Sequence, residues 1–229
     1  MIGDFLRENE KVPLMEMDAA GYVLAGGRSS RMGTEKALVQ FDGEPLVVHA
    51  LRILHNARLA ASIAGAHSPL ESFAPVVPDS EPDRGPLGGI CAALEATKAR
   101  WVVFLPVDMP LLPASFVTYL LEEAQSSGTA FTVATVDGFA QTFPVVVDRA
   151  ALPGLRLALE SGQRGCYSAF QSAAAGLGQT IKIVPVEHAV KEGKLAHPMG
   201  LPVAGWFLNV NRPADLRRAE WSRRSRAVL

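Results

Sequence analysis

The chain has 229 residues, of which 48% are hydrophobic and 20% charged, and its formal net charge is −1. A chain of this length buries about 70% of its unfolded surface, so it needs no disulfide or metal for stability, and its balanced charge argues against nucleic-acid binding. Because no stretch reaches the ~20 apolar residues of a membrane span and the N-terminus lacks the apolar core of a signal peptide, we expect a cytoplasmic protein without membrane or nucleic-acid partners.

After a polar leader at residues 1–18, apolar runs and turn residues predict strands that alternate with helices. The run at 19–25 ends in glycines and is typical of a buried first strand. The predicted strands are 19–25, 37–41, 60–64, 75–77, 101–105, 129–136, 142–147, 181–186 and 206–210. The predicted helices are 45–58, 87–98, 113–124, 150–160, 165–175 and 213–224.

This alternation indicates parallel strands joined by crossover helices, with helices on both faces of the sheet. The stretch 129–147 instead holds two consecutive strands, which predicts a mixed sheet. We therefore expect one α/β domain over residues 19–229, built as three α/β/α layers around a mixed, mainly parallel sheet.

The loop after the first predicted strand combines glycines with cations. Gly26 and Gly27 allow the backbone to approach an anion closely, and Arg31 and Lys36 can bind phosphate oxygens. The spacing matches neither the dinucleotide-binding glycine pattern nor the P-loop. The sequence predicts a phosphate-binding loop, and the alternative is a solvated glycine turn with two surface cations.

Asp108 follows a strongly apolar predicted strand and lies between Pro106 and Pro110. Ligands of open α/β sheets bind at the carboxyl ends of the strands, and Mg²⁺ commonly takes one or two carboxylates together with substrate phosphates. Asp108 is therefore a candidate metal ligand. The alternative is a turn residue or an N-cap of the next helix.

Two further groups follow predicted strands. Asp79 precedes a turn and Gly85 and Pro86 lie near the start of the next predicted helix, whose free N–H groups could hold a nucleobase edge or a phosphate. Asn209 and Asn211 end the predicted strand 206–210 and could contact a sugar or metal-bound water, or be simple turn residues.

Other reactive or charged residues receive no role. Cys91 and Cys166 lack the spacing of a disulfide framework or zinc site. The histidines lack metal-ligand spacing. The arginines at the C-terminus are expected to form a solvated helix face: Arg217, Arg218, Arg223, Arg224 and Arg226.

Four motifs together resemble the molybdenum cofactor guanylyltransferases within the wider NTP-transferase family. LAGGRSSRMGTEK at 24–36 is similar to that family's LAGGxSxRMGxDK, with Glu35 in place of Asp, and GPLGG at 85–89 is similar to GPLAG. PVDMP at 106–110 and FLNVNRPADL at 207–216 resemble the metal motif and the closing FxNxNTPxDL, with Arg212 in place of Thr. The resemblance covers about 20–218.

The resemblance implies a Rossmann-like fold of the nucleotide-diphospho-sugar transferase type and transfer of GMP from GTP to the terminal phosphate of molybdopterin, with release of pyrophosphate. Lys36, Arg31 and Asp108 would be catalytic, and Asp108 would hold Mg²⁺, or Mn²⁺. The nucleotide-binding residues would be Leu24, Ala25, Gly26, Gly27, Lys36, Asp79, Gly85, Pro86, Leu87 and Asp108. Asn209 and Asn211 would contact the acceptor or metal-bound water.

One departure bears on the nucleobase. The stretch after the second strand of the core, 63–67, reads IAGAH and lacks the asparagine found there in the family. A related cytidylyltransferase that uses CTP is therefore an alternative, and a non-catalytic nucleotide-binding regulator is another. Residues 141–144 and 193–202 are candidates for acceptor contact, and partners could include other proteins of cofactor biosynthesis or molybdoenzymes.

Overall fold

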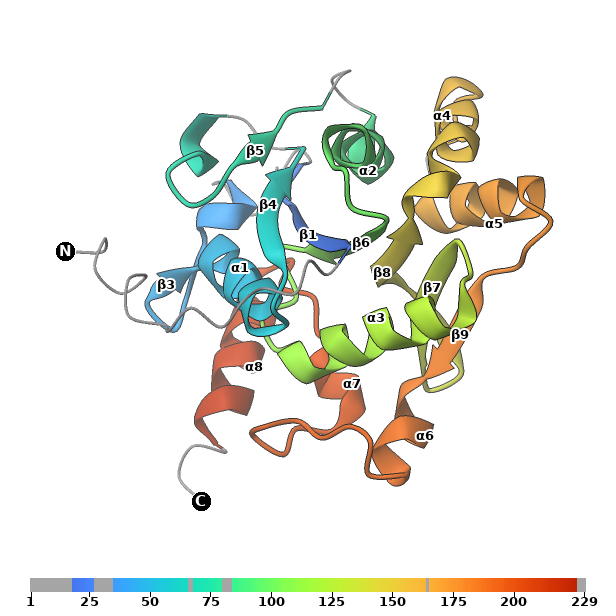
Figure 1. The fold of residues 1–229 in the computed structure, drawn as a ribbon. Coiled ribbons are helices and arrows are strands. Elements are labelled where there is room, and N and C mark those ends of the chain that lie inside the picture. The colour runs from blue at the N-terminus through green and yellow to red at the C-terminus, as the bar shows by residue number, and fades with distance from the viewer. Residues whose placement is uncertain (1–17, 27–34, 66–67, 80–83, 164, 226–229) are drawn as a thin grey trace.

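The computed structural model describes residues 18–26, 35–65, 68–79, 84–163 and 165–225. Within them, seven strands form one sheet in the order β5-β4-β1-β6-β8-β7-β9, and Figure 1 shows helices on both sides of it. The sheet strands are β1 (Ala19–Leu24), β4 (Ala60–Ala64), β5 (Val76–Val77), β6 (Trp101–Pro106), β7 (Phe131–Val136), β8 (Phe139–Asp148) and β9 (Lys182–Pro185).

A separate hairpin and eight α-helices complete the described part of the chain. The hairpin strands are β2 (Gln40–Phe41) and β3 (Glu44–Pro45). The helices are α1 (Leu46–Asn56), α2 (Gly85–Ala96), α3 (Ala114–Ser127), α4 (Leu152–Glu160), α5 (Cys166–Gly176), α6 (Val186–Lys191), α7 (Val203–Trp206) and α8 (Pro213–Arg224). Short 3₁₀ turns lie at Lys36–Leu38, Ser68–Leu70 and Arg149–Ala151.

The central strands are buried on both faces, as expected for a sheet between two helix layers. In β6, Val103 and Leu105 pack into the core formed with α1 and α3. The alternate residues Val102 and Phe104 pack into the core formed with α2, α4 and α5. The nearly continuous apolar sequence of β6 therefore serves two cores, and the predicted three-layer architecture is confirmed.

The sheet is mixed, as the consecutive strands had predicted. β1 pairs in parallel with β4 and β6, and β4 with β5. β8 runs antiparallel to both β6 and β7, and β9 runs parallel to β7. The parallel strands β1, β4, β5 and β6 consequently end at the same edge of the sheet.

Several predicted boundaries were displaced. The segment at 37–41 begins in a 3₁₀ turn and is a strand only at Gln40–Phe41, and α2 begins at Gly85 instead of Leu87. Pro45 closes β3 and precedes α1 rather than starting it. Val186 opens the unpredicted helix α6, because β9 ends at Pro185, which cannot donate to a further ladder.

The predicted strand at 206–210 was wrong. Val203–Trp206 is the short helix α7, and the segment that follows has no regular structure before α8. Trp206 is buried and its indole N–H donates to the Leu201 oxygen at 2.8 Å, which holds the turn in place. Val210 N–H donates to the Asp108 oxygen at 2.9 Å, so this segment crosses the end of β6 and does not extend the sheet.

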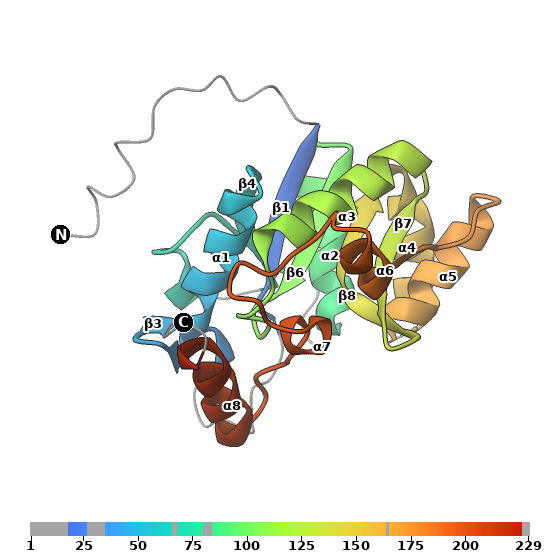
Figure 2. The same cartoon turned by 90° about the horizontal axis from the view of Figure 1, so that it is seen from below.

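Helix α8 packs beside the β2–β3 hairpin, as Figures 1 and 2 both show. Arg223 and Arg224 lie 3.3 and 3.7 Å from the Asp42 carboxylate, and the Arg223 guanidinium lies 5.7 Å from the centre of the Phe41 ring. The expectation of a solvated arginine face is therefore corrected for Arg223, which is partly covered, whereas Arg224 remains exposed. Arg226 lies outside the described residues.

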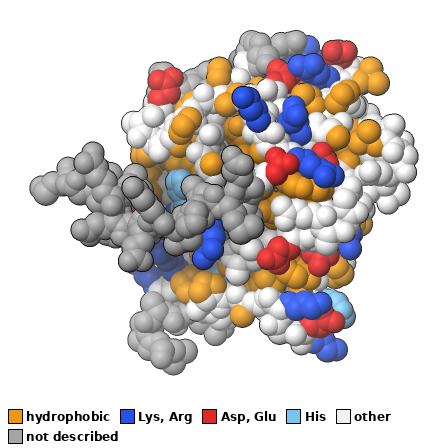
Figure 3. Space-filling view, viewed as in Figure 1, with side chains coloured by type: hydrophobic (Ala, Val, Ile, Leu, Met, Phe, Trp, Pro, Cys, Tyr) orange, Lys and Arg blue, Asp and Glu red, His pale blue; other side chains and the backbone are white. Residues whose placement is uncertain are grey.

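The charged surface and the two cysteines fit what the sequence indicated. Acidic and basic side chains are interspersed on the face in Figure 3. Cys91 and Cys166 are free and buried, and burial raises the pKa of each to about 11, which fits the absence of an assigned role. In the described part of the chain, no helix is both long and apolar enough to cross a bilayer.

Candidate active site

Backbone groups pack closely where β1 and β4 end. Ala25 N–H donates to the Ala64 oxygen at 3.1 Å, and a Cβ added to Gly26 would lie only 2.5 Å from the Gly65 oxygen. Gly65 has a φ of +74°, a conformation that favours glycine. Both glycines are therefore required by the close approach of the two strand ends.

Asp79 lies beneath the same junction, after β5. One of its carboxylate oxygens, Oδ1, is buried and would lie 3.1 Å from a Cβ added to Gly89 on α2. Gly65 N–H donates to the Val77 oxygen at 3.0 Å, which brings β5 against β4. The glycines of GPLGG thus let the first turn of α2 approach the ends of these strands.

A lysine, an aspartate and an asparagine from distant parts of the chain meet at the end of β6. Lys36 Nζ donates to Asp108 Oδ2 at 2.6 Å and to Asn211 Oδ1 at 2.5 Å. The side chains of Lys36 and Asp108 are 22% and 15% exposed, so their charges face each other in a partly desolvated place. The structure therefore joins three of the predicted site residues in one cluster.

Asp108 does not cap the next helix. Helix α3 begins at Ala114 after Pro113, and the Asp108 carboxylate instead accepts from Lys36. Its second oxygen, Oδ1, is buried and accepts no hydrogen bond from the residues that the structure describes. The N-cap interpretation is therefore wrong, and one oxygen of Asp108 remains available to a ligand.

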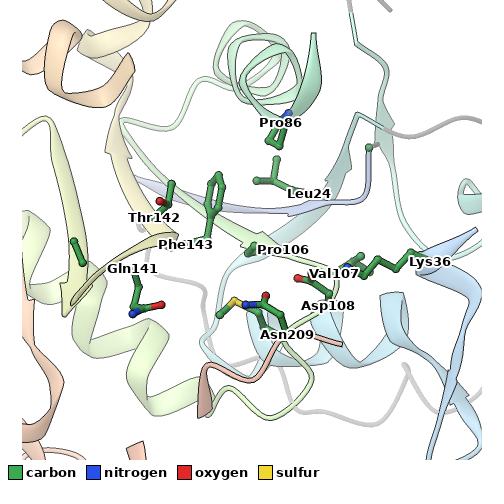
Figure 4. Close-up of a pocket in the computed structure, with 13 residues that line it drawn as sticks. Leu24, Lys36, Pro86, Pro106, Val107, Asp108, Gln141, Thr142, Phe143 and Asn209 are labelled. Atoms are coloured by element: carbon green, nitrogen blue, oxygen red, sulfur yellow. Dashed lines mark hydrogen bonds and ion pairs between the residues drawn. The ribbon is translucent and has the colours of Figure 1, made fainter. Parts of the chain in front are cut away.

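A cavity of about 450 Å³ lies beside this cluster. Figure 4 shows Leu24 and Pro86 on one side, Thr142 and Phe143 from β8 on another, and Lys36, Asp108 and Asn209 on a third. The described residues that line it are Leu24, Gly26, Lys36, Pro86, Pro106, Val107, Asp108, Met109, Ala140, Gln141, Thr142, Phe143 and Asn209. This volume lies in the usual range of small-molecule pockets.

Some of the predicted nucleotide-binding residues line the cavity and others do not. Leu24, Gly26, Lys36, Pro86 and Asp108 line the cavity. The remaining described members, which are not among the lining residues, are Ala25, Asp79, Gly85 and Leu87. Leu87 is fully buried in the core. Gly27 and Arg31 lie outside the described residues.

The two candidate acceptor segments also differ. Gln141, Thr142 and Phe143 line the cavity, whereas the loop 193–202 contributes no lining residue. In that loop His197 is buried and its Nε2 lies 3.0 Å from the Leu111 oxygen, which fastens the loop to the segment before α3. Of the two candidate segments, only the one on β8 therefore reaches the cavity.

Sequence reasoning missed Pro106, Val107, Met109 and Ala140 in the cavity wall. The first three belong to the PVDMP motif around Asp108, so the motif itself was the available signal. Ala140 carries no such signal, because its place depends on the antiparallel return of β8.

The residues present fit a divalent cation that binds mainly through substrate. No group of three or more His, Cys, Asp or Glu side chains in the described ranges could hold a metal by itself. Asp108 offers one buried oxygen with no hydrogen-bond donor in the described part of the chain. Mg²⁺ commonly binds one or two carboxylates and completes its shell with phosphates and water, so one carboxylate beside a nucleotide-sized cavity suffices.

Comparison with known proteins places the chain among nucleotidyltransferases. The family model of the MobA-like NTP transferase domain matches residues 21–176. The molybdenum cofactor guanylyltransferase of Cupriavidus metallidurans is 38% identical over 158 residues, covering 64% of this chain and 77% of that protein. The one from Bordetella pertussis is 38% identical over 157 residues, covering 64% and 79%.

Solved structures share the fold. Molybdopterin-guanine dinucleotide biosynthesis protein A from Archaeoglobus fulgidus superposes with a TM-score of 0.71 at 22% identity, covering 90% of this chain and 99% of the other. The 2-C-methyl-D-erythritol 4-phosphate cytidylyltransferase from Thermus thermophilus gives a TM-score of 0.60 at 18% identity, covering 89% and 98%. At these identities the likeness shows the fold alone.

Proposed function

The chain belongs to the MobA-like NTP transferase family, among the molybdenum cofactor guanylyltransferases, and we propose that it transfers GMP from GTP to the terminal phosphate of molybdopterin. The family uses a divalent metal, and we propose Mg²⁺, with Mn²⁺ as a substitute. The observation that carries the proposal is the Lys36–Asp108–Asn211 cluster beside the cavity. GTP and a molybdopterin-type acceptor would be the partners in the reaction.

In the reaction, an oxygen of the acceptor phosphate attacks the α-phosphorus of GTP and forms a new P–O bond. The bond from that phosphorus to the oxygen bridging to the β-phosphate breaks, and its electron pair leaves with pyrophosphate. The attacking phosphate is already an anion, so no strong general base is required. Such transfers depend mainly on positioning and on charge stabilisation.

Each cluster residue has a proposed role in that step. The Lys36 ammonium would stabilise the charge that builds on the leaving pyrophosphate, and Arg31 would assist it from the glycine-rich loop. Asp108 would hold the divalent cation through its available oxygen, and the bound cation supplies neutralisation of the phosphate charges. Asn209 and Asn211 would contact the acceptor or metal-bound water.

The walls of the cavity suggest which substrate lies where. Leu24, at the end of β1, and Pro86, in the first turn of α2, are proposed to contact the nucleotide. Thr142 and Phe143, on β8, would face the acceptor, since they form a separate wall of the cavity from Lys36 and Asp108 (Figure 4). A pterin is planar, and the Phe143 ring offers an apolar surface for it.

A panel of GTP, CTP and ATP with molybdopterin and Mg²⁺, followed by pyrophosphate release, tests the proposal. We expect release with GTP that requires both the acceptor and the metal. Failure to release pyrophosphate with any nucleotide would contradict a transfer function and favour a regulator that only binds nucleotides. We also propose that the product passes to other biosynthetic proteins or molybdoenzymes, and pull-down with such proteins tests that step.

A cytidylyltransferase for the same acceptor is the second candidate. It is favoured by one observation: Ile63, Ala64 and Gly65 bring no amide side chain to the end of β4. A base bound beside these three residues would meet backbone groups, and their side chains would not select guanine over cytosine. Preference for CTP over GTP in the same panel would replace the first candidate with this one.

A further inference from the structure

Asn211 belongs to a segment with no regular structure and is exposed, yet its side chain contacts the centre of the site. Its Oδ1 accepts from Lys36 Nζ at 2.5 Å. An exposed asparagine keeps one orientation only if its backbone is held, because a free backbone samples many conformations and moves the side chain with it. The contacts that fix this backbone therefore bear on Lys36.

The backbone is fastened on both sides of Asn211. On one side, Val210 N–H donates to the backbone oxygen of Asp108 at 2.9 Å. On the other, one carboxylate oxygen of Asp215 accepts from Asn211 N–H at 3.0 Å and from Arg212 N–H at 2.9 Å. Asp215 thus holds the backbone of the residue that holds Lys36.

We propose that Asp215, in the first turn of α8, is a positioning residue for nucleotidyl transfer that acts through Asn211 on Lys36. The proposal rests on the proposed function. Asp215 touches no cavity wall in the described part of the chain, so its effect must pass through the hydrogen bonds to Asn211 and from Asn211 to Lys36.

Ordinary helix capping is the rival explanation, since an acidic residue in the first turn also stabilises the helix. The two differ in what they change. Capping alone alters the free energy of unfolding and leaves each folded molecule equally active. Positioning alters the orientation of Lys36, so it changes kcat and is lost when Asn211 no longer links the two residues.

The chain offers a matched control at the far end of the same helix. Asp42 pairs with Arg223 and Arg224 of α8 at 3.3 and 3.7 Å, whereas the hydrogen bonds of Asn211 in the described part of the chain go to Lys36 and Asp215. Asp42 has a φ of 49°, which asparagine tolerates, so Asp42→Asn removes the charge without a backbone penalty. This variant loosens α8 and leaves Asp215 in place.

The experiment compares Asp215→Ala, Asp215→Asn, Asn211→Ala, the double alanine variant and Asp42→Asn. Steady-state transfer from GTP to molybdopterin with Mg²⁺ gives kcat and KM, calorimetry gives GTP affinity without acceptor, and urea unfolding gives stability. We expect Asp215→Ala to lower kcat about 10-fold, the order seen for residues that orient active-site ligands. Asp215→Asn, which keeps an acceptor oxygen, should retain most activity, and Asp42→Asn should lose stability without losing kcat.

In the double variant, removal of Asp215 should add little to the loss caused by Asn211→Ala, because both changes break one chain of contacts. Multiplicative losses, or an Asp215→Ala variant that loses stability while kcat is unchanged, would overturn the inference. If the wild-type protein does not use molybdopterin, the proposed function fails separately. The GTP affinities of the single and double variants then decide the inference. It is supported if Asp215→Ala weakens GTP binding less when Asn211 is already alanine, and it is rejected if the two effects on affinity are independent.

Discussion

Lys36 and Asp108 form the centre of the candidate active site. Their opposite charges lie 2.6 Å apart and are only partly exposed. The pair suits triphosphate chemistry because the two groups have complementary tasks. The ammonium can stabilise phosphate charge, and the carboxylate keeps a second oxygen for a cation.

Replacement of Asp108 by alanine should abolish transfer while much of the nucleotide binding remains. The change removes the proposed metal ligand but leaves the cavity walls at Leu24 and Pro86. We expect kcat to fall by about 100-fold or more, the order for loss of a group that organises transition-state charge. Pyrophosphate release and GTP calorimetry measure the two effects, and near-normal turnover would show that the metal assignment is wrong.

Replacement of Lys36 by alanine should cost at least ~2 kcal/mol in the transfer step, or about 30-fold in rate. The loss follows from removal of a cation next to the developing pyrophosphate charge. Lys98→Ala is the matched control, because Lys98 is exposed before β6, at the opposite edge of the sheet. Equal rates for the two variants in single-turnover transfer would reject a phosphate role for Lys36.

The packing of helices and strands brings these residues together. It also determines which substitutions affect the reaction and which affect only stability. Helix α8 is held at both ends, by Asp215 beside Asn211 next to the site and by Arg223 beside Asp42 away from it. Helices α4 and α5 pack with each other, and the Phe170 ring of α5 lies 6.3 Å from that of the cavity-lining Phe143. Changes at the α4–α5 contact that leave Phe170 in place should therefore alter stability and leave the reaction intact.

Gly154→Ala is expected to destabilise the protein through the α4–α5 contact. A Cβ at this position would lie 2.9 Å from the Ala173 Cβ, so the helices must separate, which costs about 1–3 kcal/mol for overpacking. Gly176→Ala is the control, because nothing lies within 4 Å of its added Cβ and alanine favours a helix. Urea midpoints compare the two, and equal stability would contradict the tight packing of these helices.

At the scale of the whole molecule, two buried histidines link stability to pH. His197 Nε2 lies 3.0 Å from the Leu111 oxygen and its Nδ1 accepts from Met199 N–H at 3.1 Å, an arrangement of the neutral ring. His49 Nε2 lies 2.9 Å from the Phe41 oxygen. Burial is the main cause that lowers the pKa of both histidines below 6.5.

The unfolded chain therefore binds protons at these histidines before the folded protein does. The free energy of unfolding should be highest above pH 6.5 and should fall as the pH drops through 6.5 towards the lowered pKa values. Urea unfolding from about pH 7.5 to about 5.5, above the range of ordinary carboxyl groups, measures this slope. His197→Gln should flatten it, and a stability that is constant or rises over that interval would contradict the prediction.

Some elements can be predicted from local sequence, whereas others depend on contacts between distant residues. β6 is predictable because its uninterrupted apolar sequence serves two cores, and the Asp108 position follows from the end of that strand. The segment at 206–210 has similar apolar residues but is not a strand. The Trp206 indole N–H donates to the Leu201 oxygen and Val210 N–H donates to the Asp108 oxygen, and no local pattern reveals these contacts.

The glycine-rich motif, the aspartate after β6 and the family could all be identified from the amino-acid sequence. Each is defined by residue types at fixed spacing along the chain, which can be read without knowing the fold. The division of the chain at residue 18 and the roles of Gly27 and Arg31 stay predictions. Only the tertiary structure decided that Lys36 meets both Asp108 and Asn211, that β8 forms a cavity wall, and that Asp215 fastens Asn211. These contacts join residues up to 175 positions apart, and such pairings depend on how helices and strands pack around two shared cores.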